Sequence, residues 1–64
     1  MKTPIIEVYQ GRDSLWFWHL IATNGKVIAD GAEGYDKKSN AMAAVRTVRR
    51  TIPLAKTRSL GEAA

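Results

Sequence analysis

The chain has 64 residues, with ten lysines and arginines against six aspartates and glutamates, one histidine and no cysteine. A chain of this length forms one domain at most and buries only about 60% of the surface that its unfolded form exposes. The lack of cysteine excludes disulfides and cysteine-based zinc sites, and a single histidine excludes a multi-histidine metal centre. Small domains usually rely on a disulfide, a metal or a partner chain, so we expect a partner chain.

The sequence predicts a soluble, unprocessed protein in the cytoplasm, with no membrane partner. No apolar run approaches the ~18 residues needed to span a bilayer. Glu7 and Gln10 interrupt the apolar character of the N-terminus, so no signal peptide is expected. The lack of cysteine fits a reducing compartment. The net charge of +4 permits binding to nucleic acid but does not require it.

Three short apolar segments predict β-strands at residues 5–9, 15–22 and 27–29. The first two are rich in β-branched and aromatic residues, which suit a half-buried pleated surface. Turn-forming residues separate the first two segments, and Asn24-Gly25 between the last two is a strong hairpin signal. We therefore expect a three-stranded antiparallel meander.

The second strand indicates which face of this sheet meets the core. One face carries Trp16, Trp18, Leu20 and Ala22. The other carries Leu15, Phe17, His19 and Ile21. The tryptophan face should meet the helix, because tryptophans bury the largest area. The second face is either an ordinary surface with scattered apolar residues or a contact patch.

The third strand can point either of two sets of side chains at the core. A two-residue Asn-Gly turn points Val27 and Ala29 inward, whereas a three-residue Thr-Asn-Gly loop with a bulge at Gly25 points Ile28 inward. We expect the second arrangement, because Ile28 is the largest side chain of this strand.

After Tyr35, which is expected to anchor its loop on the sheet, the apolar period changes to that of a helix. The helical stripe consists of Ala41, Ala44, Val45, Val48 and Ile52. Asp36 is the expected N-cap. Pro53 disfavours helical geometry in the residue before it, so the helix should end near Arg50 or Thr51.

Residues 54–60, "LAKTRSL", alternate in a way that permits a short fourth strand, either at an edge or paired with a partner chain. The competing interpretation is a disordered tail. Residues 61–64 should fray. The predicted fold is thus a single α+β domain over residues 1–60, with three strands, one helix and a short C-terminal strand.

The segment "GAEGYDKKSN" at residues 31–40 has two glycines and a Lys-Ser pair before a helix, as a phosphate-binding loop does. Such a loop needs glycine immediately before that pair, and here Lys37 stands there. The parallel sheet around such a loop also needs a far longer chain. We therefore expect Gly31 and Gly34 to relieve backbone strain. A weaker anion site at the helix N-terminus, helped by Lys37 and Lys38, stays open.

No constellation of residues predicts catalysis, a metal site or a cofactor. His19 should lie at the surface or rim among aliphatic and aromatic neighbours, without the partner that catalysis needs. Asp30, Glu33 and Asp36 match no calcium-loop spacing and are explained by capping and solvation. We expect no enzymatic activity.

Basic residues are concentrated in and before the helix. The candidate anion-binding or nucleic-acid patch consists of Lys37, Lys38, Arg46, Arg49 and Arg50. On a helical wheel Lys38 and Met42 fall with the arginines, away from the apolar stripe. We favour the interpretation that these charges form a solvated face that complements the helix dipole. The exposed aromatic side chains on which single-stranded nucleic acids stack are missing from this helix.

The assembled pattern resembles the YegP-like family, a small bacterial and archaeal domain of unknown function. The resemblance lies in "IEVY" (6–9), an aromatic residue at 16, "W-x-L" (18–20), "NG" (24–25), "IA" (28–29) and "EGY" (33–35) followed by Lys38. It spans about residues 5–50 and implies a three-strand, helix, strand unit. Two such units are expected to form one continuous sheet by exchanging their last strands, and no catalytic residues are implied.

This single unit should therefore be a homodimer and a non-catalytic structural or protein-interaction module. The candidate dimer or contact patch consists of Phe17, Ile21, Leu54 and Leu60. The family usually has charged residues where this chain has Phe17, His19 and Ile21. The alternative function is sequence-tolerant nucleic-acid binding through the basic helix face, which the sequence does not favour.

Overall fold

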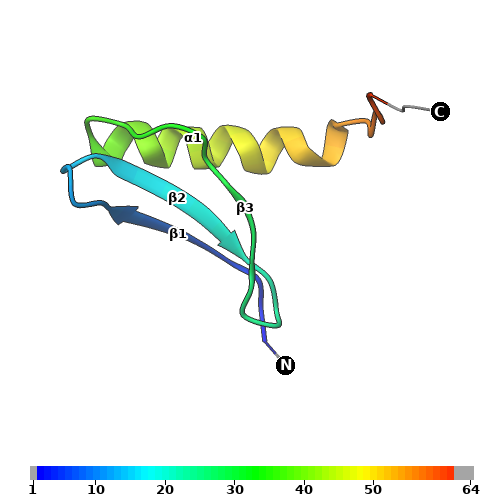
Figure 1. The fold of residues 1–64 in the computed structure, drawn as a ribbon, viewed down its shortest axis with the longest axis horizontal. Coiled ribbons are helices and arrows are strands. Elements are labelled where there is room, and N and C mark those ends of the chain that lie inside the picture. Colours follow the sequence, from blue (N-terminus) through cyan, green and yellow to red (C-terminus); the bar gives the residue numbers. More distant parts are fainter. Residues whose placement is uncertain (1, 62–64) are drawn as a thin grey trace.

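A computed structural model describes residues 2–61 and consists of one antiparallel sheet with one α-helix lying across it (Figure 1). The strands are β1 (Ile5–Gln10), β2 (Trp16–Ile21) and β3 (Val27–Asp30). They are followed by the helix α1 (Lys38–Thr51) and one 3-10 turn, η1 (Ile52–Leu54). Within the described residues, no helix has the length and apolar character needed to cross a bilayer.

The sheet has the strand order β1-β2-β3, and both strand pairs are antiparallel, so the predicted meander is confirmed. The helix α1 contacts β1 and β2 (Figure 1). Trp18 lies in the core with Ala41 and Val45 of α1, and Ala41 is fully buried. The tryptophan face therefore meets the helix as expected, and a small helix residue leaves room for the large ring.

The loop between β2 and β3 is the expected three-residue loop. The N–H of Ala22 donates to the carbonyl of Lys26 at 2.8 Å, and the N–H of Gly25 donates to the carbonyl of Ala22 at 2.9 Å. Gly25 has a φ of 86°, in the left-handed region that glycine adopts without cost.

The inward orientation expected for Ile28 is nevertheless wrong. The register passes from Ile21 opposite Val27 to Leu20 opposite Ala29, so that Ile28 is skipped. A one-residue shift moves the following side chains to the other face of a sheet. Ile28 is 63% exposed, and Ala29 takes the position beside Leu20.

Tyr35 holds the loop after β3 on the sheet, as predicted. Its N–H donates to the carbonyl of Trp16 at 2.8 Å, and its own carbonyl accepts from the N–H of Trp16 at 2.7 Å. This isolated bridge continues the pairing of β2 beyond the end of β3.

The two glycines of this loop are required by space and not by backbone strain. Neither Gly31 nor Gly34 has a left-handed φ, so the expectation that they relieve strain is wrong. A Cβ at Gly31 would collide with Nε1 of Trp18 and lie 2.9 Å from Cδ1 of the same ring. A Cβ at Gly34 would lie 2.9 Å from Cβ of Leu15. The loop thus lies directly against the sheet.

The helix begins later than its expected N-cap. Lys37 occupies the N-cap position, without a side-chain hydrogen bond, so the prediction of Asp36 as the cap is wrong. Asp36 lies one residue too far from the first-turn N–H groups that a cap accepts from. The end of the helix at Thr51 is as predicted, and Pro53 lies in the 3-10 turn that follows.

The segment after η1 leads away from the sheet, past the end of α1 (Figure 1). Residues 55–61 form no strand within this single chain, so the predicted fourth strand is not formed here. The pairing of this segment with a second chain stays a prediction. Of the tail predicted to fray, residues 61–64, only Gly61 is among the described residues.

Candidate interaction surfaces

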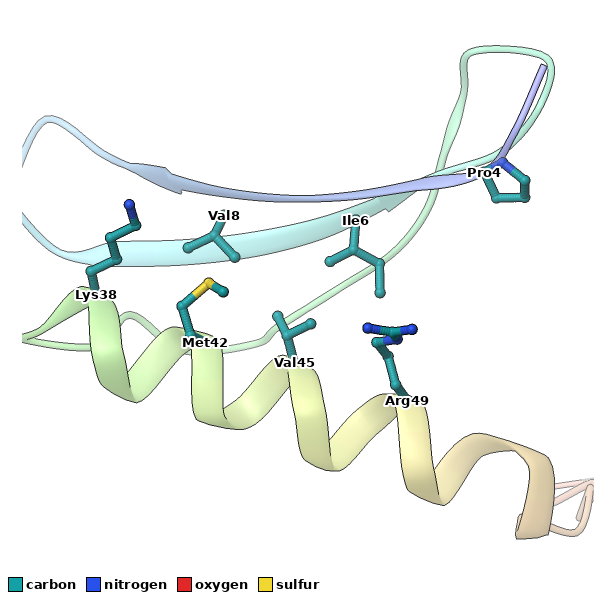
Figure 2. Close-up of a pocket in the computed structure, with 7 residues that line it drawn as sticks. All are labelled: Pro4, Ile6, Val8, Lys38, Met42, Val45 and Arg49. Atoms are coloured by element: carbon teal, nitrogen blue, oxygen red, sulfur yellow. The ribbon is translucent and has the colours of Figure 1, made fainter.

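A groove of about 550 Å³ lies between β1 and α1 (Figure 2). Its lining residues are Pro4, Ile6, Val8, Lys38, Met42, Val45 and Arg49. Apolar side chains line its middle, and one cationic side chain stands towards each end, as Figure 2 shows. The Nζ of Lys38 lies 5.7 Å from the centroid of the Trp16 ring, a distance at which a cation and an aromatic face attract.

The groove corrects the helical-wheel interpretation. Lys38 and Met42 were expected on the side of α1 away from its apolar stripe, but they line the groove together with Val45. The spacing of positions 38, 42, 45 and 49 is that of one helix face, which here points at β1. Met42 is 39% exposed in the single chain, because nothing in the described residues covers this side of it.

Beside this groove, β1 forms a free edge of the sheet. It pairs with β2 on one side only, so every second N–H and C=O group of β1 points to the open side. Such an edge can pair with another extended segment. Edge and groove lie side by side, and together they form a surface that can accept a strand.

The outer face of the sheet, opposite α1, carries three rows of side chains set by the strand register. An apolar row contains Ile5, Ile21 and Val27. A charged row contains Glu7, His19 and Asp30. An aromatic row contains Tyr9 and Phe17, whose ring centroids lie 5.8 Å apart. We call this surface the outer face.

His19 has a carboxylate neighbour that the sequence reasoning missed. Its Nε2 lies 2.7 Å from Oε1 of Glu7, and its ring centroid lies 4.8 Å from that of Tyr9. Period-two alternation placed Glu7 and His19 on the same face, but the predicted strand bounds would pair Glu7 with Phe17, and the observed register sets it opposite His19 instead. Among residues 2–61 no group of three or more potential metal ligands occurs.

The candidate contact patch is divided within one chain. Phe17 and Ile21 are half-buried on the outer face. Leu54 lies in η1, which contacts α1 but no strand. It is therefore on the helix side of the sheet, opposite the outer face. Leu54 and Leu60 are 81% and 77% exposed. The two leucines therefore offer apolar surface that their own chain leaves uncovered.

The candidate basic patch is divided as well. Arg46, Arg49 and Arg50 line one hollow of about 360 Å³, which we call the arginine hollow. Lys37 and Lys38 lie at the other end of α1, roughly 12 Å from Arg46 along the helix axis at 1.5 Å per residue. Within residues 2–61 the only ion pair joins His19 and Glu7, so the three arginines have no acidic partner there.

Comparison with known proteins places the chain in a family. The family model described as "Domain of unknown function (DUF1508)" matches residues 12–58. The chain belongs to this family. DUF1508 is the YegP-like family, so the resemblance seen in the sequence is confirmed. The match includes most of the segment that follows α1, beyond the end of the resemblance near residue 50.

A solved structure supports the same assignment. The NMR solution structure of a protein from Haloferax volcanii has a TM-score of 0.82 to this chain and 30% sequence identity. The match covers 92% of this chain and 98% of that one, so the two have nearly the same extent as well as the same fold. No match was found among curated proteins.

Proposed function

We propose that this DUF1508 chain is a non-catalytic interaction module that acts as a homodimer, in which each copy pairs its residues 55–60 with the sheet of the other. The observation that carries the proposal is the accessible surface. A compact chain of 7.1 kDa exposes about 4,100 Å² by the usual scaling with mass. This chain exposes 5584 Å². The excess of roughly 1,500 Å² is larger than the ~800 Å² that each partner contributes to a standard interface.

The shape of the chain supports a missing partner. Its radius of gyration is 14.0 Å, against about 11 Å for a compact domain of this length. The C-terminal end of α1 projects beyond the sheet (Figure 1). Only Trp18, Ala41 and Val45 are buried among the apolar residues of the described part. A second chain would complete a core that one chain leaves open.

The segment after α1 supplies the element to exchange. Leu54 and Leu60 expose most of their surface, and the family match extends to residue 58. The family resemblance implies that the last strand is exchanged between units. Exchange of an identical element is a low-cost route to a dimer, because each chain gives the contact that it receives.

A non-catalytic role and a cytoplasmic location belong to the same proposal. The His19–Glu7 pair lies on the outer face of a sheet, whereas catalytic sites are usually concave and exclude water. The lack of cysteine suits a reducing compartment.

The mass of the chain in solution tests the proposal. Light scattering over the micromolar range should give twice the chain mass for the full chain and the single mass after deletion of residues 53–64. Amides at 55–59 should exchange slowly with solvent in the dimer and rapidly after dilution to monomer. A full chain that stays monomeric throughout the range would overturn the proposal.

The arginine hollow supports a second candidate function, sequence-tolerant binding of nucleic acid. Three arginines without an acidic partner in the described residues can contact successive phosphates. Binding of this kind falls steeply with salt. The test is the affinity for single- and double-stranded oligonucleotides at low and at physiological salt. Weak binding whose affinity does not change between the two salt concentrations would exclude this candidate.

A further inference from the structure

We infer that β1, and not β3, is the edge that accepts the partner's residues 55–60, and that Glu7 is the residue that recognises the partner's Lys56 and Arg58. Because this acceptor edge needs a second copy of the chain, it rests on the proposed function. The reasons are the regularity of β1, the charges of the groove and the rows of the outer face.

The two edges of the sheet differ in regularity. β1 has six residues, as many as the segment 55–60, and pairs with β2 without interruption. β3 has four residues and skips Ile28 in its register. A bulge at an edge bends the strand and breaks its ladder, which is one of the ways in which proteins block further pairing. β1 is therefore the edge prepared for a full-length strand.

The groove decides which face of the segment points towards α1. Alternate side chains of an extended segment point to opposite sides, so Ala55, Thr57 and Ser59 form one face. These small side chains suit a groove already walled by Met42 and Val45. The opposite orientation would push Lys56 and Arg58 against Lys38 and Arg49, which are like charges at the ends of the groove. The basic face must point the other way.

The outer face then provides a matching pattern for the basic face. On β1 the outward side chains are Ile5, Glu7 and Tyr9. On the segment 55–60 they are Lys56, Arg58 and Leu60, whereas Leu54 precedes the segment in η1. An acidic residue between apolar residues thus meets two basic residues that are followed by a leucine.

The match holds whether the segment runs parallel or antiparallel to β1. One cation lies opposite Glu7 and the other is its diagonal neighbour. The Glu7 carboxylate can contact His19 of β2 on one side of β1 and the partner's segment on the other side. Its Oε1 is beside His19, and a carboxylate has a second oxygen that can accept from a lysine or an arginine. Glu7 is also 52% exposed, so a partner's side chain can reach it.

Charge reversal tests this recognition directly. Glu7→Lys alone and Lys56→Glu/Arg58→Glu alone should each weaken the homodimer on the order of tenfold or more, since each dimer contains the contact twice. A mixture of the two variants should form heterodimers in preference to either homodimer. In the mixed pair, both acceptor edges face a segment of opposite charge. Native mass spectrometry counts the three species.

Asp30→Lys is the matched control. It makes the same change of charge on the outer face, but on β3. It should leave the dimer affinity within about twofold of wild type, as surface changes away from a contact do. Circular dichroism melts report whether each variant folds. If Glu7→Lys fails to fold, the variant Lys56→Glu/Arg58→Glu still tests the contact.

The two proposals fail in different ways. A wild-type dimer that is lost on deletion of residues 53–64 but is indifferent to both charge reversals would overturn the role of Glu7 and leave the proposed function standing. A dimer weakened by Asp30→Lys instead would place the acceptor edge at β3. A monomeric wild type would overturn both.

Discussion

Replacement of Trp18 by alanine tests the packing that holds the helix on the sheet. Trp18 is 7% exposed and forms the buried core together with Ala41 and Val45. A buried tryptophan removes roughly 150–250 Å² from water. At about 25 cal/mol per Å² this burial is worth roughly 4–6 kcal/mol, and large-to-small aromatic replacements cost about 3–5 kcal/mol in measured series. A chain of 64 residues has a total stability of only about 3–10 kcal/mol. The Trp18→Ala variant should therefore retain little folded protein.

Urea unfolding followed by far-ultraviolet circular dichroism measures this loss at a fixed protein concentration, because association would add its own stability. Trp16→Ala is the matched control. The same ring at position 16 is only half-buried on the same face, so its loss should cost clearly less than the loss of Trp18. A Trp18→Ala variant that unfolds cooperatively within about 1 kcal/mol of wild type would refute the assigned core.

Three further changes test the loops, the third strand and the basic surface. Gly31→Ala should cost about 1–3 kcal/mol in urea unfolding, because its methyl group meets the Trp18 ring. Gly25→Ala should cost only about 1 kcal/mol, for its left-handed φ, since nothing lies near that Cβ. Ala29→Leu should destabilise by about 1–3 kcal/mol through overpacking, whereas Ile28→Ser should stay within about 0.5 kcal/mol, and equal effects would contradict the bulge. Triple alanine replacement of the arginine hollow should leave folding intact. If the chain binds single-stranded nucleic acid, it should also lower the salt slope by ~0.7 for each phosphate that the arginines no longer neutralise.

The strands, the helix and the core face could be predicted from the sequence because their signals are local. Period-two alternation indicated the face of Trp18, and Asn24-Gly25 indicated the loop before β3. The spacing of Ala41 and Val45 predicted the helix face that is buried. Each of these signals depends only on neighbours in the chain, so it can be interpreted without knowledge of the tertiary contacts.

Other features depended on contacts between distant residues. The bulge at Ile28 overrode the side-chain direction that the preceding loop implied. Gly31 is glycine because the Trp18 ring occupies the space of its side chain, which local strain arguments do not reveal. By contrast, Lys38 was assigned to the solvent side although its seven-residue spacing from Val45 places both on one helix face, which lines the groove beside β1.

Among the surfaces, the sequence placed Glu7 and His19 on the same face of the sheet, but the register that sets them opposite each other depends on a loop at residues 11–15, one residue later than the predicted turn. The role of residues 55–60 could not be decided from the sequence alone. A weakly apolar segment forms a strand only if another chain provides the edge.

The measurement that tests the central claim most directly is an isotope-filtered NMR experiment on a mixture of labelled and unlabelled full chains. It detects only proton contacts between different copies. We predict intermolecular contacts between backbone protons of residues 55–60 in one copy and those of Ile5–Gln10 in the other. Intermolecular contacts that avoid residues 55–60, or a sample in which that segment contacts only its own chain, would contradict strand exchange at β1.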